Sequence, residues 1–185
     1  NFGAFTSHLT ANAAREIGCE SALIGHCEER AGMMSLLAAA GVRAQDAAAT
    51  VNETLRQEIL RAQEAGLNVL YCIGERTEEL DRWREVLGAQ LDQGLRGVDP
   101  RRVAVAYEPI WSIGPGKTPA DKEYIEKIAR FVKERTGGAS VVYGGGLKQD
   151  NAAMLASIGD IDGGLIALTR FSGEIGFYPD EYLGI

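Results

Sequence analysis

The sequence predicts an α/β protein built on a parallel sheet of the (β/α) barrel type. Short apolar runs alternate with longer amphipathic segments, which is the pattern of βα units joined into a parallel sheet. Several runs end on a polar side chain or on glycines, and parallel barrels place their chemistry at the carboxyl ends of their strands. A complete barrel has eight strands, and this sequence contains about five. We therefore expect one partial barrel domain over residues 1–185.

Five apolar runs have the length and composition of strands buried in a parallel sheet. In the run at 103–107, five apolar residues follow one another without a polar interruption, which predicts burial on both faces. The expected strands are residues 21–25, 68–73, 103–107, 140–143 and 164–168.

Between these runs, apolar residues recur at the spacing of one helical face. The last helix has a start signal, in which Thr118 offers an N-cap, Pro119 a first-turn proline and Asp121 an acid near the positive helix end. It should end at the Gly-Gly pair that begins at Gly137. The core-facing stripes are Val51, Leu55 and Ile59, then Trp83, Leu87 and Leu91, then Ile125, Ile128 and Val132.

The composition is that of an ordinary soluble domain with an acidic balance. Of the 185 residues, 45% are hydrophobic and 24% are charged, and the net charge is −7 at pH 7. This balance argues against a general nucleic-acid-binding role, which requires a basic face. No apolar stretch approaches the roughly 20 residues of a membrane span, and the N-terminal residues lack the features of a signal peptide. We therefore expect a cytoplasmic protein with no nucleic-acid or membrane partner.

The three cysteines, Cys19, Cys27 and Cys72, are odd in number. Their spacing matches neither a Cys-x-x-Cys metal site nor a disulfide framework. We expect them to be reduced and structural, and the sequence predicts no metal site and no cofactor.

The strand expected at 103–107 ends on Glu108 and opens into a Gly-rich loop. Residues 109–118 combine glycines, prolines and a tryptophan, a composition suited to a hinged lid. Glu108 is therefore a candidate general base at the carboxyl end of a buried strand. The alternative is a strand-terminal glutamate that pairs with an arginine or caps a helix.

The strand expected at 21–25 ends before His26, and the following residues are able to start a helix. In a parallel barrel the two strand ends share one face, so His26 and Glu108 are candidates for the same site. The alternative is a structural histidine, which is the commoner role of an isolated histidine after a strand.

Two motifs together resemble those of the triosephosphate isomerase family. The segment at 25–30, Gly-His-Cys-Glu-Glu-Arg, is similar to the family's Gly-His-Ser-Glu-Arg-Arg turn. The segment at 107–118 nearly reproduces its Tyr-Glu-Pro-x-Trp-x-Ile-Gly-x-Gly-Lys-Thr loop, and shorter matches occur at 3–6, 70–75 and 143–146 in the family's order. The resemblance implies a TIM barrel, a small phosphorylated sugar as substrate, and aldose-ketose isomerisation through an enediolate.

The resemblance also assigns roles to individual residues. Glu108 would move a proton between adjacent carbons, and His26 would polarise the carbonyl in the neutral form for which triosephosphate isomerase is itself the standard example. Glu28 would be an acid beside the site, and its alternative role is an acid at a helix N-terminus. Gly114 would donate its backbone N–H to the phosphate from the lid.

The rest of the phosphate pocket departs from the family. Gly146 stands where the family's Tyr-Gly-Gly-Ser has a serine, which removes a hydroxyl that would bond the phosphate and the closed lid. Ala167 and Leu168 stand where the family has a Gly-Gly pair, and leucine prevents the close backbone approach that glycine allows. With the tail at 169–180, these changes favour a tetrulose-phosphate isomerase of erythritol-type catabolism over the glycolytic triose enzyme. The alternative is harmless drift.

The resemblance further implies that the family's first three strands are absent, together with an Asn-x-Lys segment whose lysine lies beside the substrate. An open five-strand sheet would expose two unpaired edges, so a catalytically incomplete fragment that binds ligands or partner chains is the alternative to an isomerase. The family's opening loop implies a homodimer. Here its acid and arginine are replaced by His8 and Glu29, a reversed ion pair worth about 0 to 1 kcal/mol.

Overall fold

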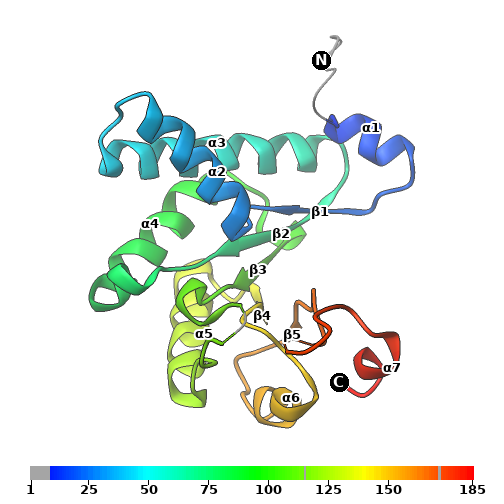
Figure 1. Cartoon of the computed structure of the whole chain (residues 1–185). Helices are drawn as coiled ribbons and strands as arrows, with labels where there is room; N and C mark the ends of the chain where they lie inside the picture. The colour runs from blue at the N-terminus through cyan, green and yellow to red at the C-terminus, as the bar shows by residue number, and fades with distance from the viewer. Residues whose placement is uncertain (1–8, 115, 171) are drawn as a thin grey trace.

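The computed structural model describes residues 9–114, 116–170 and 172–185. Its centre is one five-stranded parallel sheet in which the strands follow chain order (Figure 1). This arrangement confirms the predicted partial parallel barrel. The strands are Ser21–Ile24 (β1), Asn68–Ile73 (β2), Val103–Tyr107 (β3), Ser140–Tyr143 (β4) and Gly163–Gly164 (β5).

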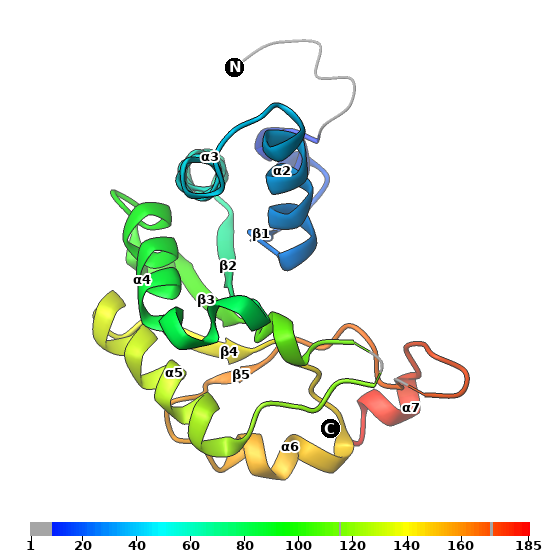
Figure 2. The same cartoon turned by 60° about the vertical axis from the view of Figure 1, so that its left-hand side comes forward.

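Helices connect the strands and lie in an arc outside the curved sheet, as Figure 2 shows. Across the described ranges, no helix is both long enough and apolar enough to cross a membrane. The α-helices are Ala11–Glu16 (α1), Cys27–Ala39 (α2), Ala44–Glu64 (α3), Trp83–Gly94 (α4), Lys122–Thr136 (α5), Gln149–Ala156 (α6) and Pro179–Tyr182 (α7). Short 3₁₀ helices cover Thr77–Arg82 (η1), Pro100–Arg102 (η2) and Ile110–Ser112 (η3).

The core lies between the sheet and helices α3, α4 and α5. The predicted stripes face it, because Leu55, Leu87 and Ile128 are each 0% exposed. Removing a large apolar side chain from water contributes roughly 1.5 to 3 kcal/mol, so these stripes hold the helices on the sheet. Trp83 is only half-buried and packs edge-on against Phe131, with ring centroids 5.2 Å apart.

Helix α5 begins later than the sequence predicted. Its N-cap is Asp121, whose side chain accepts a hydrogen bond of 2.8 Å from the N–H of Tyr124, so the prediction of Thr118 was wrong. Aspartate caps more strongly than threonine, and the buried side chain of Ala120 anchors the chain just before the helix. The predicted end is confirmed, since Gly137 adopts the left-handed conformation at φ +73°.

The last strand is shorter than the predicted run at 164–168. The N–H of Leu165 donates to the carbonyl of Tyr143 at 2.9 Å, and Tyr143 is the last residue of β4. Because β4 ends there, the following residues have no ladder partner. Ala167 and Leu168 therefore lie in the loop after β5, and the prediction of a strand through Leu168 was wrong.

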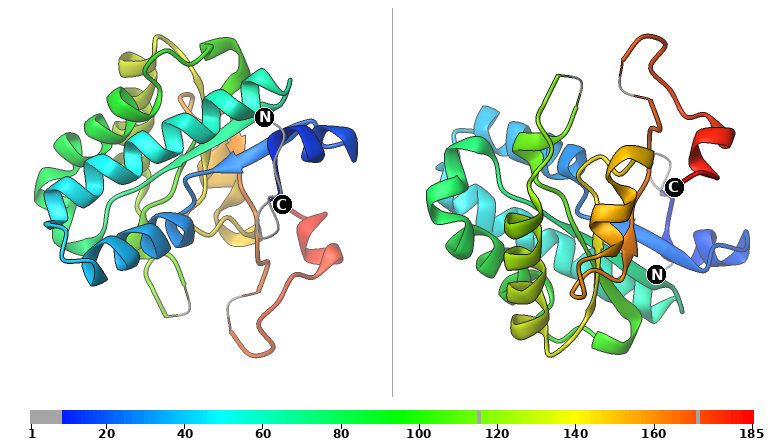
Figure 3. Two further views of the ribbon diagram at one scale, coloured as in Figure 1. Left: turned by 90° about the horizontal axis from the view of Figure 1, so that it is seen from above. Right: turned by 90° about the horizontal axis from the view of Figure 1, so that it is seen from below.

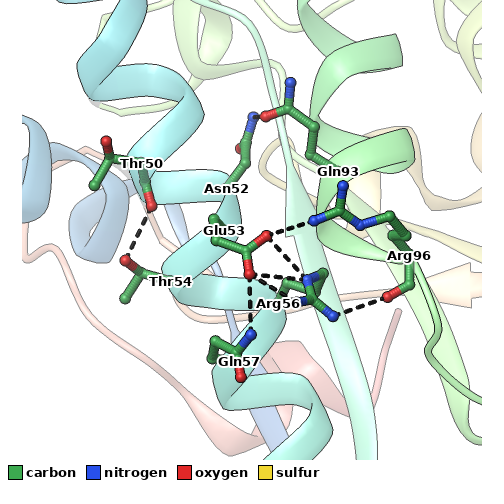
Figure 4. Close-up of polar contacts among 8 residues, drawn as sticks. All are labelled: Thr50, Asn52, Glu53, Thr54, Arg56, Gln57, Gln93 and Arg96. Atoms are coloured by element: carbon green, nitrogen blue, oxygen red, sulfur yellow. Dashed lines mark hydrogen bonds and ion pairs between the residues drawn. The ribbon is translucent and has the colours of Figure 1, made fainter.

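Polar side chains tie α3 to α4 on the outer surface (Figure 4). Glu53 of α3 accepts hydrogen bonds from Arg56 on the same helix and from Arg96, which follows α4. These cations lower the pKa of Glu53 to about 2, with the Arg56 hydrogen bond as the largest cause. Asn52 donates to Gln93 of α4 at 3.2 Å, and its carbonyl oxygen accepts a hydrogen bond from Arg30 of α2.

Two segments leave the body of the molecule on the same side. Figure 3 shows that the loop between β3 and α5 and the chain after β5 both extend beyond the carboxyl edge of the sheet. The predicted lid and the predicted phosphate-side loop therefore share the edge on which the strand-terminal side chains lie.

Candidate active site

The carboxyl ends of β1 and β3 bring His26 and Glu108 together. The Nε2 atom of His26 lies 3.0 Å from Oε1 of Glu108. Glu108 is buried, at 2% exposure, whereas the side chain of His26 is 35% exposed. The sequence placed both residues on one edge of the sheet, and the structure makes them direct neighbours with one side open to solvent.

His26 is held by a tight turn and by the helix that follows it. Gly25 has φ +83°, and a Cβ there would lie 2.9 Å from the carbonyl oxygen of Cys72, so glycine is required. His26 is the N-cap of α2, and its Nδ1 accepts a hydrogen bond of 3.4 Å from the N–H of Glu28. Since Nδ1 accepts, the ring proton lies on Nε2 and is directed at Glu108.

Glu108 continues the sheet and packs between two glycines. Its N–H donates to the carbonyl of Ile73 at 2.8 Å, and its Oε2 accepts a hydrogen bond of 3.0 Å from the N–H of Cys27. A Cβ on Gly74 would lie 2.0 Å from the carbonyl oxygen of Glu108, and one on Gly144 would lie 3.1 Å from its Cγ. Gly74 therefore makes room for the backbone of Glu108, and Gly144 makes room for its side chain.

Burial raises the pKa of Glu108 above its ordinary value. The shift is opposed by nearby His26, by the hydrogen bond from the Cys27 N–H and by the charge of Arg30. A carboxylate with a raised pKa is more basic, which suits a group that removes a proton from carbon near neutral pH.

Arg30 fastens this edge of the sheet to the helices. Its buried guanidinium donates to the carbonyl oxygens of Gly25 and Cys72, at 2.8 Å and 3.0 Å. It also donates to Asn52 of α3 at 2.9 Å and to the hydroxyl of Tyr71 at 2.9 Å. Because these hydrogen bonds satisfy the buried cation from several elements, the turn that carries His26 is rigidly placed.

Glu75, after β2, gathers three aromatic side chains at the start of the predicted lid. Its Oε1 accepts hydrogen bonds from Tyr107 and Trp111, each 2.8 Å, and from Tyr124 at 3.1 Å. Burial raises the pKa of this carboxyl group. Glu75 closes the family match at 70–75, just after the strand expected at 68–73, and the sequence assigned it no role. The aromatic residues at the end of β3 and after it were the sequence feature that could have indicated partners for this carboxylate.

Residues 109–118 form the loop that we predicted to be a hinged lid. Its first part is folded, because Ser112 donates to the carbonyl of Pro109 at 3.0 Å. Gly114 and Gly116 have φ of +110° and +76°, which strongly favours glycine. Position 115 lies outside the described residues, and closure of the lid stays a prediction.

The predicted phosphate-side residues lie along the same edge. Gly146 has φ +87°, and its carbonyl accepts a hydrogen bond of 3.0 Å from the side chain of Asn151. Ala167 is exposed and Leu168 is half-buried. Within the described ranges, no hydrogen bond joins these residues or Gly114 to the His26 and Glu108 pair.

Two acids follow His26 and behave differently. The side chain of Glu28 is exposed, and its contact with His26 is made by its backbone N–H, which fits the helix-terminus alternative. The carboxylate of Glu29 accepts a hydrogen bond from the N–H of Gly25. Burial, and next the charge of Glu29, raise the pKa of Glu58 to about 7.

The opening match at 3–6 and the predicted partner His8 lie outside the described residues.

Comparisons with known proteins agree on one family. The family model described as triosephosphate isomerase matches residues 1–174. A triosephosphate isomerase of Pelodictyon phaeoclathratiforme is 34% identical, with 90% of this chain and 64% of the relative covered. One from Cupriavidus pinatubonensis is 37% identical, with 93% and 69% covered. The crystal structure of triosephosphate isomerase from Bartonella henselae superposes with a TM-score of 0.69 at 27% identity, over 89% of this chain and 65% of that one. The chain thus spans about two thirds of the length of these relatives.

Proposed function

Because this chain belongs to the triosephosphate isomerase family, we propose that it acts as an aldose-ketose isomerase on a small sugar phosphate. The observation that carries the proposal is the contact between the imidazole Nε2 of His26 and the buried carboxylate of Glu108, 3.0 Å apart. A base and a hydrogen-bond donor side by side match the two demands of the reaction, proton removal and polarisation of a carbonyl.

Each residue has a distinct part in the proposed reaction. Glu108 removes a proton from the carbon next to the carbonyl, and the Nε2–H of His26 donates to the carbonyl oxygen as negative charge develops there. The product of this step is an enediolate. Glu108 then returns the proton to the neighbouring carbon, while the hydroxyl proton passes from the oxygen of the first carbon to the former carbonyl oxygen through Nε2 of His26. The carbonyl thereby moves by one position.

Substrate binding requires Glu108 to move. In the present arrangement its carboxylate bonds to both His26 and the N–H of Cys27, so it fills the space beside the imidazole. Glu108 immediately precedes the loop at 109–118, and we propose that closure of this loop over the substrate swings the carboxylate toward the reacting carbon. Closure also excludes water from the enediolate.

For the substrate, we propose a tetrulose phosphate, with triose phosphate as the second candidate. The support is the sequence of the phosphate-side loops, where Gly146 lacks a hydroxyl and Leu168 adds bulk. Fewer side-chain donors and a larger apolar residue shift the anion outward and leave a longer site. We also propose a homodimer, for which the support is the match at 3–6 to the family's opening loop.

The test is isomerisation in deuterated water on protein purified from its natural host and on matched variants of it. The parent should convert a sugar phosphate and incorporate deuterium at the carbon next to the carbonyl. Glu108→Gln removes the base and should abolish both signals. Glu85→Gln, at an exposed carboxylate of α4, is the control and should retain them. A parent protein that binds sugar phosphates without converting them would instead support the binding-fragment alternative.

A further inference from the structure

The residues at the carboxyl ends of β1 and β3 also form a set of metal-ligating groups. His26, Cys27 and Glu108 each offer one ligand atom, and these atoms all lie within 4.8 Å of one another. We propose that the three side chains bind a single divalent cation of the zinc class. This inference goes beyond the proposed isomerase activity, and because the cation would occupy the same atoms of His26 and Glu108, its binding would compete with isomerisation.

The spacing of the ligand atoms is close to that of a tetrahedral zinc site. With metal bonds of about 2.0 to 2.3 Å, tetrahedral ligands lie roughly 3.3 to 3.6 Å from one another. The Nε2 of His26 is 3.0 Å from Oε1 of Glu108, the Sγ of Cys27 is 3.9 Å from both ring nitrogens of His26, and all the ligand atoms lie within 4.8 Å of one another. The nitrogen–oxygen pair is closer than the ideal and the sulfur is farther from the imidazole, so rotation of the Cys27 side chain toward Nε2 is the movement that would bring all three around one cation.

The chemistry of the three ligands selects the cation. A thiolate and an imidazole favour borderline and soft metals, whereas Ca²⁺ and Mg²⁺ require several oxygen ligands. Three protein ligands leave the fourth position of zinc open, and the side chain of His26, at 35% exposure, leaves that side accessible. Glu28 and Glu29, in the first turn of α2, add negative charge beside the site.

The surrounding hydrogen bonds orient the ligands. The N–H of Cys27 donates to Oε2 of Glu108 at 3.0 Å, which leaves Oε1 directed at His26. Such secondary contacts fix the direction of metal-binding carboxylates. Coordination at Nε2 shifts the ring proton to Nδ1 and breaks the hydrogen bond from the N–H of Glu28. That bond is 3.4 Å long and therefore weak.

The sequence alone could not reveal this set. Cys27 and His26 are adjacent, but the third ligand comes from a different strand, and the cysteines show no paired metal spacing. Cys27 stands where the resembled turn has serine, so the thiol is a feature of this chain. Cys19, half-buried elsewhere, provides a matched control thiol.

The experiment titrates the parent protein with Co²⁺ as a spectroscopic probe and with Zn²⁺ by calorimetry. The expected result is one cation per chain, with the near-ultraviolet absorption of a thiolate bound to cobalt. Cys27→Ser should lose this absorption and weaken Zn²⁺ binding at least about tenfold, while Cys19→Ser keeps both. Circular dichroism checks that each variant is folded.

Glu108→Gln tests the ligand from β3 and should also weaken Zn²⁺ binding, with the thiolate absorption retained at saturating Co²⁺. A parent that binds neither cation would overturn the proposal. Thiolate absorption that survives in Cys27→Ser, or disappears in Cys19→Ser, would overturn it as well, because the bound cation would then lie at another cysteine.

Discussion

The centre of the sheet and the segment after β5 differ in the interactions that stabilise them: apolar packing dominates in the first, and polar contacts in the second. In β3, Val105 and Tyr107 are 0% exposed, and helices α3 to α5 cover this part of the sheet. In β5, Gly163 and Gly164 are both exposed, and no residue of α7 is buried. Packing therefore determines where Glu108 lies, directly after β3.

The segment after β5 depends instead on a few polar contacts. Arg170 pairs with Glu181 of α7, and the N–H of Tyr178 donates to the hydroxyl of Thr169 at 2.8 Å. Ala167 and Leu168, which depart from the family's glycine pair, lie in this segment. The comparison indicates that sequence changes in this segment have a low structural cost, because little of the core depends on it.

The largest expected contrast is in stability. Leu55→Ala opens a cavity at a fully buried position of α3 and should lower the free energy of unfolding by about 2 to 5 kcal/mol. Leu183→Ala, at a position that is 81% exposed, should change it by less than about 0.5 kcal/mol. Urea unfolding followed by circular dichroism measures both. Equal losses would show that the tail belongs to the core.

The next largest effect is expected on turnover, when the carboxylate side chain of Glu108 at the end of β3 is shortened. Glu108→Asp should lower turnover by on the order of 100-fold with the fold intact, because a displacement near 1 Å is costly in proton transfer. Glu174→Asp, at an exposed carboxylate of the tail, should leave turnover unchanged. Exchange of substrate protons with solvent measures the chemical step directly. If the Glu108→Asp variant exchanges as fast as the parent, Glu108 is not the base.

A smaller effect, on substrate preference, is expected from restoring the family's residues in the loop after β5. Ala167→Gly combined with Leu168→Gly should shift preference toward triose phosphate by roughly 1 to 3 kcal/mol. Gly146 is kept, because its φ of +87° would strain a serine. Catalytic efficiencies on triose and tetrulose phosphates, compared between parent and variant, measure this shift. A parent that already prefers the triose would show that these departures do not set the substrate.

The last expected effect is a pH dependence of stability at Glu58 of α3. The pKa of Glu58 is raised from its ordinary value of 4.5 to about 7, first by burial and then by Glu29. Between these values the folded chain holds a proton that the unfolded chain has released, so stability falls as the pH rises from about 4.5 to 7. Glu58→Gln should flatten this slope. Urea unfolding at several pH values measures it, and an unchanged slope would contradict the assignment.

Much of the fold was determined by local sequence. The apolar runs predicted β2, β3 and β4 with the bounds that the structure shows, because a strand buried on both faces leaves an uninterrupted hydrophobic signal. The same signal failed for β5, where the run at 164–168 continues past the end of its neighbour β4. A strand requires a neighbouring strand to pair with, and the apolar residues of one strand do not show how long its neighbour is.

The candidate site shows the same division. The sequence by itself determined that His26 and Glu108 follow strand ends and that Gly25 precedes His26. Only the tertiary structure decided that these residues touch, since the contact depends on the parallel register that pairs Ile24 with Tyr71 and Ile73 with Tyr107. The hydrogen bond from Cys27 to Glu108 and the buried position of Glu75 follow from that register. Both depend on contacts between residues far apart in the chain, and a local sequence pattern does not show which distant residues will meet.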